Sequence, residues 1–339
     1  ANVIYSLCAL SRRRAFVVAS DEAEAQRLQR DLESMGMHPL LYPTRDFTFR
    51  DTAATSHEYE HSRLHVLSGL LSGDCDCVIA CIDAALQYTM PETILRKRTV
   101  SLSTAQEISP EALTALLLSC GYERAEQVEG PGQFAQRGGI FDFFPPNSIA
   151  PVRIEFWGDE IDTITYFDPE SQRRTDQTDS ITITPAVETP VANATLLAKQ
   201  IREHASGLRG KTAPAAKAIL LQEAESLEAG VHLSNADKFI SFLYPQPATL
   251  FDYCDGQFLL FVSDPMNVKE RIRTTTWQWG EDLRDLLAEG ILCRGLDSFA
   301  QDAAYAADRF AAYGAIYLDS FAHGNYDAPL RTAIHLSVR

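Results

Sequence analysis

The stretch GPGQFAQRGGIFDFFPPNSIAPVRIEFWGDEIDTITYFDPESQR, residues 130–173, decides how the rest of the chain is interpreted. It alternates short strand patterns with strong turn signals, namely two glycine-rich turns, a Pro145–Pro146–Asn147 turn and a hairpin turn at Gly158–Asp159. No nucleophile stands beside a base in this stretch. The pattern therefore predicts a small sheet that presents a recognition surface and not an active site.

Strands and helices alternate on the N-terminal side of this stretch. Buried strands are predicted at 15–20, 38–43 and 77–82, with a helix capped by Ser20 after the first and an apolar helical stripe over 58–72. Strands separated by helices predict a parallel sheet. The sequence therefore predicts that residues 1–97 form one piece of an α/β domain.

Residues 98–184 predict a compact α+β module, whose one helix, 110–120, is capped by Ser109. From 185 to 330 helices return, and this region is interpreted as the completion of the α/β layer. The last segment, 331–339, is assigned to the start of a linker. The remaining expected elements of 185–330 are a helical pair at 194–206 and 215–229, strands at 248–254, 258–264 and 315–321, and helices around 265–287 and 298–312.

Composition limits the class of function. The 339 residues are 45% hydrophobic and 22% charged, which is typical of a soluble globular protein. The formal net charge of −16 disfavours nonspecific binding to nucleic acid, because that binding depends on neutralising phosphates with Lys and Arg. Two short basic runs, Arg12–Arg14 and Arg96–Arg98, are expected to be solvated ends of helices or strands.

The seven cysteines include no CxxC pair, which is typical of reduced thiols in a cytoplasmic protein. Cys75, Cys77 and Cys81 match no common zinc spacing, so no metal site is expected. No run of 18 apolar residues predicts a membrane span, and no signal peptide is visible. Ala1 in place of Met indicates a fragment or a trimmed chain.

Two motifs resemble catalytic ones. Residues 205–212, ASGLRGKT, nearly match a phosphate-binding loop, but a helix and not a strand is predicted before them. Asp159–Glu160–Ile161–Asp162 resembles the acidic box of a helicase-type ATPase, but it lies in a predicted hairpin turn. The eight histidines form no recognisable constellation. No catalytic, cofactor-binding or metal-binding residue is therefore predicted.

Four segments carry a resemblance to a known family: 42–47 (YPTRDF), 58–64 (EYEHSRL), 130–146 and 153–173. They resemble the N-terminal region of the bacterial transcription-repair coupling factors, which is similar to the excision-repair protein UvrB. The resemblance implies a degenerate RecA-like α/β domain in two pieces (1A, 1–97, and 1B, 185–330) with domain 2 (98–184) inserted between them. The segment 44–57 is too short for the long aromatic hairpin of UvrB, which favours the coupling factors over UvrB.

The resemblance implies that this chain is not itself an enzyme and that domain 2 recruits UvrA to lesion-stalled transcription complexes. It places the ATP- and Mg²⁺-dependent DNA translocase, and the contacts with RNA polymerase and duplex DNA, in regions downstream of this chain. The family's UvrA-binding positions fall on Arg137, Arg153 and Trp157, although an aromatic that is commonly Phe is Trp here. Asp159 and Glu160 are weaker candidates for the same surface, because a solvated turn explains them too.

The strand pattern alone supports two of these residues. In VRIEFW, alternation places Val152, Ile154 and Phe156 on one face and Arg153, Glu155 and Trp157 on the other. If the apolar face covers helix 110–120, Arg153 and Trp157 are displayed side by side, which is typical of an interface hot spot. The alternative is that Trp157 packs under a loop and Arg153 pairs with Glu155 or Asp142.

Two other functions remain alternatives. One is an ATP-binding motor of the UvrB or helicase type. It would bind nucleotide tightly, and the Lys211→Ala substitution would abolish that binding. A DNA-binding module would bind duplex with an affinity that falls steeply with salt.

Overall fold

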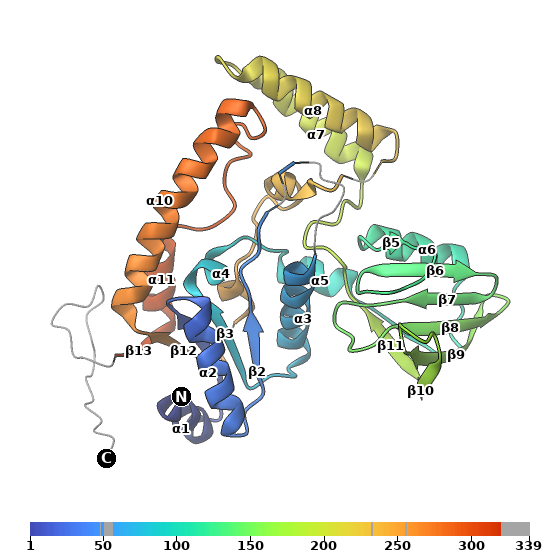
Figure 1. The fold of residues 1–339 in the computed structure, drawn as a ribbon, viewed down its shortest axis with the longest axis horizontal. Helices are drawn as coiled ribbons and strands as arrows, with labels where there is room; N and C mark the ends of the chain where they lie inside the picture. Colours follow the sequence, from blue (N-terminus) through green and yellow to red (C-terminus); the bar gives the residue numbers. More distant parts are fainter. Residues whose placement is uncertain (48, 51–56, 232, 255, 320–339) are drawn as a thin grey trace.

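The structure is a computed structural model, and it describes residues 1–47, 49–50, 57–231, 233–254 and 256–319. Figure 1 shows a parallel sheet covered by helices, a second sheet beside it, and a helical arm that projects from the top of the view. The predicted linker, 331–339, and the end of the strand predicted at 315–321 lie outside the described residues.

The first sheet has five strands, all parallel, in the order β13-β12-β1-β3-β2. The central strand β1 pairs with β12 on one side and β3 on the other, so segments more than 200 residues apart complete one layer. The predicted α/β class with a parallel sheet is confirmed. The strands are β1 (Arg14–Ala19), β2 (Pro39–Tyr42), β3 (Cys77–Cys81), β12 (Phe258–Ser263) and β13 (Ile316–Leu318).

Helices cover both faces of this sheet. On one face α1 (Asn2–Ser11) and α2 (Glu22–Ser34) pack against Ala15, Val17 and Ala19. On the other face, residues of α3 (Glu58–Ser72), α10 (Pro265–Glu289) and α11 (Ala303–Tyr313) pack around Phe16 and Val18. Each central strand is therefore apolar on both sides, which explains its continuous run of hydrophobic residues.

Two local expectations for this region were wrong, and one helix was missed. Asp21, not Ser20, is the N-cap of α2, because its carboxylate accepts a hydrogen bond from the Glu24 N–H. The segment 248–254 contains a 3₁₀ helix, Leu250–Tyr253, and not a strand, because Thr249 and Asp252 form a capping box there. Helix α1 was not predicted.

The second sheet has six strands in the order β10-β9-β8-β7-β6-β5, and helix α6 (Pro110–Ser119) packs on one face. Ser109 caps α6, as the sequence predicts. A two-stranded ladder of β4 (Val100–Ser103) and β11 (Ser180–Ile183) joins the same core. The six strands are β5 (Glu123–Arg124), β6 (Gln133–Arg137), β7 (Ile140–Phe143), β8 (Val152–Trp157), β9 (Glu160–Phe167) and β10 (Arg174–Thr178).

The helical arm consists of α7 (Ala194–Gly207) and α8 (Ala213–Glu228), which pack on each other around a buried core that also includes Phe239, Cys293 and Leu296. Short helices follow at Ala236–Phe239 and Ile240–Leu243. Two further short helices, α4 (Ile82–Leu86) and α5 (Glu92–Arg98), lead from the parallel sheet toward β4. Among the helices that the structure describes, none is both long and apolar enough to cross a bilayer.

Candidate protein-binding surface

The predicted recognition residues lie on the six-stranded sheet, whose two faces differ sharply. Val152 and Ile154 of β8 are buried against α6 together with Phe141 and Phe143 of β7. The opposite face, called the outer face here, carries Arg153, Glu155 and Trp157 by strand alternation. The face assignments made from the sequence are therefore correct, despite a bulge between Glu155 and Phe156.

The hairpin turns of β6–β7 and β8–β9 lie at the same end of this sheet. Strand β6 starts beside Pro131, which lines a cleft with α3, and it runs from there to Arg137. The turn Gly138–Gly139 therefore lies at the end far from α3, and Figure 1 shows this end pointing away from the parallel sheet. The Phe156 N–H donates to the Gly139 carbonyl at 2.9 Å, which joins the two hairpins.

Trp157 is a highly exposed predicted site residue. Its side chain is 83% exposed at the last position of β8, where it pairs only with Glu160 of β9. An exposed Trp on a strand is a candidate contact residue, because Trp is enriched among the hot spots of protein interfaces. The alternative in which Trp157 packs under a loop is wrong.

Arg153 is not displayed beside Trp157. Its guanidinium forms a bidentate pair with Asp142 of β7, at 2.7 and 2.8 Å, and lies 4.8 Å from the Phe167 ring centroid. Its side chain is only 15% exposed. The hydrogen bond that Arg153 donates to Asp142 raises the pKa of Arg153 against the opposing effect of burial.

The reason for this difference is the strand register. Arg153 faces Asp142 directly across the β7–β8 ladder, and the segment 168–173 covers that part of the outer face. The sequence therefore assigned Arg153 to the correct face, and the alternative pairing with Asp142 is the one that forms. Glu155 pairs instead with Arg174 of β10.

The other three predicted residues lie at the turns. Arg137 is exposed, and its guanidinium donates to the Glu126 carbonyl at 2.6 Å. Asp159 and Glu160 are exposed in and after the Gly158 turn, with the Asp159 carbonyl accepting from the Ile108 N–H. One end of the sheet therefore carries Arg137, Trp157, Asp159 and Glu160. Arg153 lies four residues before Trp157 on β8, away from that end.

The motifs that resemble catalytic ones have the placements expected from the sequence. Residues 208–212 form the turn between α7 and α8, so no strand precedes them. Asp159–Asp162 forms the β8–β9 turn and the start of β9. The three clustered cysteines are buried, and burial raises the pKa of the Cys75 thiol to about 11. Within the described ranges, no three His, Cys, Asp or Glu side chains come together in a way that could hold a metal ion.

Folds of this kind usually bind a nucleotide at the carboxyl edge of the parallel sheet. In this protein a carboxylate side chain accepts the hydrogen bonds available at that edge. Glu24, in the first turn of α2, accepts hydrogen bonds from the Ser20 N–H at 2.9 Å, from the Ser20 hydroxyl at 2.8 Å and from the Ser263 hydroxyl at 2.6 Å. Asp21 occupies the cap of the same helix. Two negative charges therefore satisfy donors that a phosphate would need.

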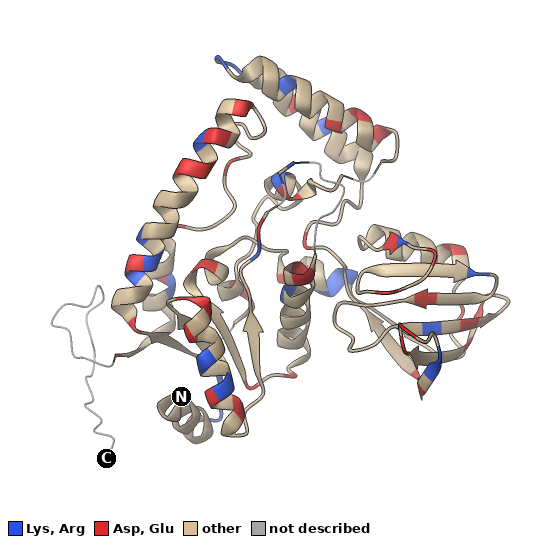
Figure 2. Cartoon of the chain, viewed as in Figure 1, with Lys and Arg blue, Asp and Glu red and all other residues tan. Residues whose placement is uncertain are grey.

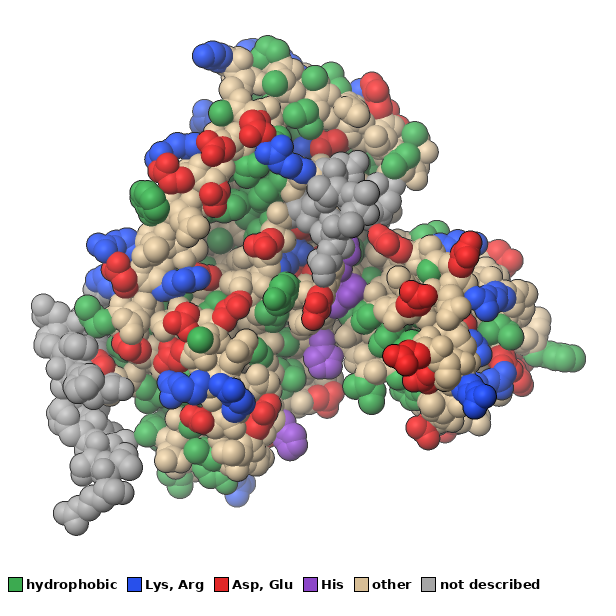
Figure 3. Space-filling model, in the orientation of Figure 1, with side chains coloured by type: hydrophobic (Ala, Val, Ile, Leu, Met, Phe, Trp, Pro, Cys, Tyr) green, Lys and Arg blue, Asp and Glu red, His purple; other side chains and the backbone are tan. Residues whose placement is uncertain are grey.

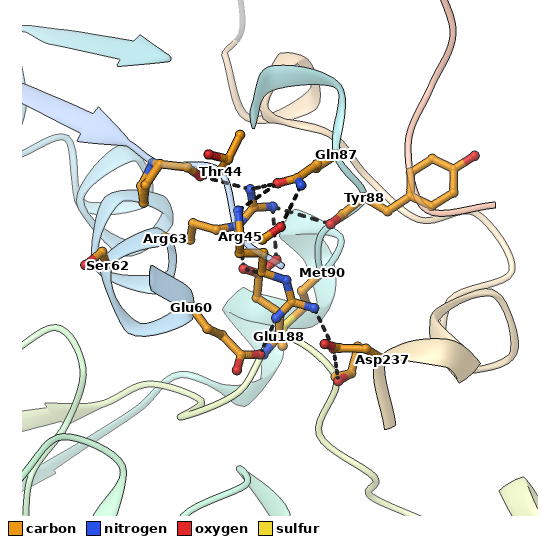
Figure 4. Close-up of polar contacts among 12 residues, drawn as sticks. Thr44, Arg45, Glu60, Ser62, Arg63, Gln87, Tyr88, Met90, Glu188 and Asp237 are labelled. Atoms are coloured by element: carbon orange, nitrogen blue, oxygen red, sulfur yellow. Dashed lines mark hydrogen bonds and ion pairs between the residues drawn. The ribbon is translucent and has the colours of Figure 1, made fainter. Parts of the chain in front are cut away.

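A buried ionic cluster lies between the two sheets, and sequence reasoning missed its role (Figure 4). Arg63 of α3 donates from Nε to Glu188 at 2.6 Å, and Arg45 donates to Glu60 at 2.6 Å. Arg45 also pairs with Asp237. Glu188 lies just after the six-stranded sheet, so the cluster fixes the returning chain to the parallel sheet.

The charges in this cluster shift one another's pKa values. Burial alone would raise the pKa of Glu60, but Arg45 and the hydrogen bond from His57 lower it to about 2. The same hydrogen bond raises the pKa of His57. The signal available in the sequence was the pair of segments 42–47 and 58–64, which carry Arg45, Glu60 and Arg63.

Histidines line the seam between α3 and the six-stranded sheet. His57, His61 and His65 recur at four-residue spacing along α3, and Figure 3 shows a row of histidine side chains along this seam. A cleft of about 630 Å³ lies here, with walls from α3, β2 and the loops at Pro131 and Pro146. Lys and Arg are scattered over most elements (Figure 2), and one run of three, Arg96–Arg98, lies in the last turn of α5.

Comparison with known proteins agrees with this architecture. Residues 100–188 match the family model described as the UvrB interaction domain. The chain is 30% identical to the transcription-repair-coupling factor of Bacillus subtilis over 284 residues, which is 81% of this chain and 24% of that protein. It is 29% identical to the Haemophilus influenzae protein of the same name over 246 residues, 72% of this chain and 21% of that protein.

The match of residues 100–188 identifies a protein that carries a UvrB interaction domain. The chain belongs to the transcription-repair-coupling factor family and corresponds to the N-terminal region of those proteins. It spans about a quarter of the length of the relatives that it matches.

Proposed function

We propose that this chain is an adaptor in transcription-coupled nucleotide excision repair and that it recruits UvrA to lesion-stalled transcription complexes. The observation that carries the proposal is the exposure of Trp157 beside Arg137, at the free end of a sheet that matches the UvrB interaction domain. Exposed Trp and Arg side chains on a rigid element dominate binding energy in many interfaces.

The proposed organisation follows the two sheets. Residues 98–184 are domain 2, the UvrA-interaction module, and residues 1–97 and 185–330 together form a degenerate RecA-like domain. The pairing of β1 with both β3 and β12 supports a single domain made from two pieces of chain. The segment 331–339, outside the described residues, would begin a linker to further domains of a longer cytoplasmic protein.

The proposal includes no catalytic activity and no cofactor for this region. Its support is the set of hydrogen bonds that Glu24 accepts, because this half-buried carboxylate already satisfies the donors that a nucleotide phosphate would need and repels a second negative charge there. Translocation on duplex DNA with ATP and Mg²⁺, and contact with RNA polymerase, would belong to the remainder of the longer protein.

Calorimetric titration with purified UvrA tests the adaptor function. The parent chain should bind, and the Arg137→Ala/Trp157→Ala double variant should bind at least tenfold more weakly, about 1.4 kcal/mol or more. The matched control is Trp277→Ala on α10, which removes another exposed tryptophan away from the six-stranded sheet and should leave binding unchanged.

The rival functions are tested on the same preparations. If the folded parent does not bind UvrA, the proposed adaptor function is wrong. Tight Mg-ATP binding that Lys211→Ala abolishes would support a motor instead, and duplex affinity that falls steeply with salt would support a DNA-binding module.

A further inference from the structure

We propose that Ile140, together with the bare turn Gly138–Gly139, forms the centre of the same contact surface as Arg137 and Trp157. This inference rests on the proposed UvrA-binding function and adds a residue that neither the resemblance nor the strand pattern singled out.

The strand register places Ile140 at the middle of the surface. It pairs with Arg137 on β6 and with Glu155 on β8, so the three side chains share the outer face. Ile140 is 37% exposed, whereas the next residue, Phe141, is fully buried on the opposite face. A branched aliphatic side chain is therefore partly exposed between an arginine and a glutamate.

The glycine turn keeps Trp157 uncovered. Continuing the β7–β8 register beyond Ile140 and Glu155 brings Gly138 opposite Trp157. Gly138 has a φ of 61°, and a Cβ built there would meet nothing within 4 Å. A Cβ at Gly139 would lie 3.3 Å from the Phe156 carbonyl oxygen. No side chain from this turn therefore stands between Trp157 and an approaching partner.

The part of the outer face around Arg153 is already occupied. Val128, Ala135 and Phe167 form a small buried cluster on it, and the Arg153–Asp142 pair lies beside Phe167. The segment 168–173 closes over this half through the Gln172 carbonyl and side chain. Among strands β6 to β8, the open part of this face is therefore the end that carries Arg137, Ile140 and Trp157.

The side chains at the end of the sheet that carries Ile140 and Trp157 predict which groups UvrA offers to this surface. Ile140 and Trp157 give an apolar centre, and the charges around it belong to Arg137, Glu155, Asp159 and Glu160. An apolar centre with a charged rim is the usual anatomy of a specific protein interface. UvrA should therefore offer an apolar patch to Ile140 and Trp157 and a carboxylate to Arg137.

The chain provides a matched control for Ile140. Ile149 lies in the loop between β7 and β8, at the other end of these strands, and its side chain is 97% exposed. Ile140→Asp and Ile149→Asp make the same chemical change in the same sheet. Calorimetric titration with UvrA should show at least tenfold weaker binding for Ile140→Asp and less than twofold change for Ile149→Asp.

Circular dichroism and thermal unfolding establish whether each variant is folded. If Ile140→Asp does not fold, Ile140→Ser removes the apolar side chain without a charge and should weaken binding at least threefold. Parent-like affinity of the folded Ile140 variant, with binding lost in Trp157→Ala, would overturn this inference and keep the adaptor function. No binding by the parent would overturn the adaptor function itself.

Discussion

Arg63 and Glu188 form an ion pair with no solvent exposure on either side chain, although 125 residues separate them in the chain. Arg63 is on α3 of the parallel-sheet region, and Glu188 lies where the chain returns from the six-stranded sheet. Arg63 also donates to the Gln87 side chain and the Pro43 carbonyl, so its guanidinium is well satisfied. This pair ties the two regions together at one point.

Removing one partner of this pair should destabilise the protein strongly. Glu188→Ala leaves a buried, unpaired arginine, which typically costs about 3–5 kcal/mol. Urea denaturation should therefore show a large loss in the free energy of unfolding. Arg202→Ala breaks the exposed pair with Glu228 on the helical arm and should leave that free energy unchanged within error. Equal stability of the parent and Glu188→Ala would contradict the role assigned to the cluster.

Stability should depend on pH through His57. The hydrogen bond from His57 to Glu60 raises the pKa of His57 in the folded protein. Its contribution is then fully present below the unfolded pKa of about 6.5 and lost as the pH rises through the higher folded pKa. The difference in unfolding free energy between the parent and His57→Gln should therefore shrink on going from about pH 6 to pH 8.

His61 supplies the contrast to His57. Burial lowers the pKa of His61 in the folded protein. The stability that the neutral imidazole provides is therefore fully present above the unfolded pKa of about 6.5, and it is lost as the pH falls through the lowered folded pKa. The difference between the parent and His61→Gln should change with pH in the opposite direction. Parallel curves for the two variants would contradict these assignments.

Arg153 and Trp157 should respond differently to truncation. Arg153→Ala leaves Asp142 buried without its partner, so the free energy of unfolding should fall by about 2 kcal/mol. Trp157→Ala removes an exposed side chain and should change that free energy by less than about 0.5 kcal/mol. Chemical denaturation alongside UvrA titration separates the two effects. Equal stability losses would show that Trp157 is also structural.

Nucleotide binding should be absent in the parent and unaffected by Lys211→Ala. Lys211 lies in the turn between α7 and α8, and Glu24 holds the donors at the carboxyl edge of the parallel sheet. Titration with Mg-ATP should give no saturable heat for either protein. A saturable signal that disappears in Lys211→Ala would contradict the placement of 205–212 as a structural turn.

The sequence predicted the parallel sheet and most helices because their signals are local. Apolar periodicity identified α3, and a serine cap with a proline identified α6. It failed at 248–254, where the apolar residues resemble a strand but a Thr249–Asp252 capping box forms a 3₁₀ helix. Local apolar content cannot distinguish these two outcomes.

The site was predictable only in part, for a physical reason. Alternation places Arg153 and Trp157 on the same face, but the exposure of each depends on strand register and on a distant loop. Asp142, 11 residues away, determines the orientation of Arg153. The ionic cluster joins residues from segments near 45, 60, 188 and 237, and no local pattern connects them.

The ladder between β4 and β11 pairs Val100 with Ile183, so the chain enters and leaves the region that contains the six-stranded sheet at adjacent positions about 5 Å apart. A segment whose two ends lie close together can be inserted into a surface loop of another fold without separating the two ends of that loop. The entropic cost of closing the loop is then small. The region 100–183 is therefore a compact insertion whose two ends lie close together. An unrelated scaffold that offers one surface loop should accept it, with its hairpin end still free to engage a partner.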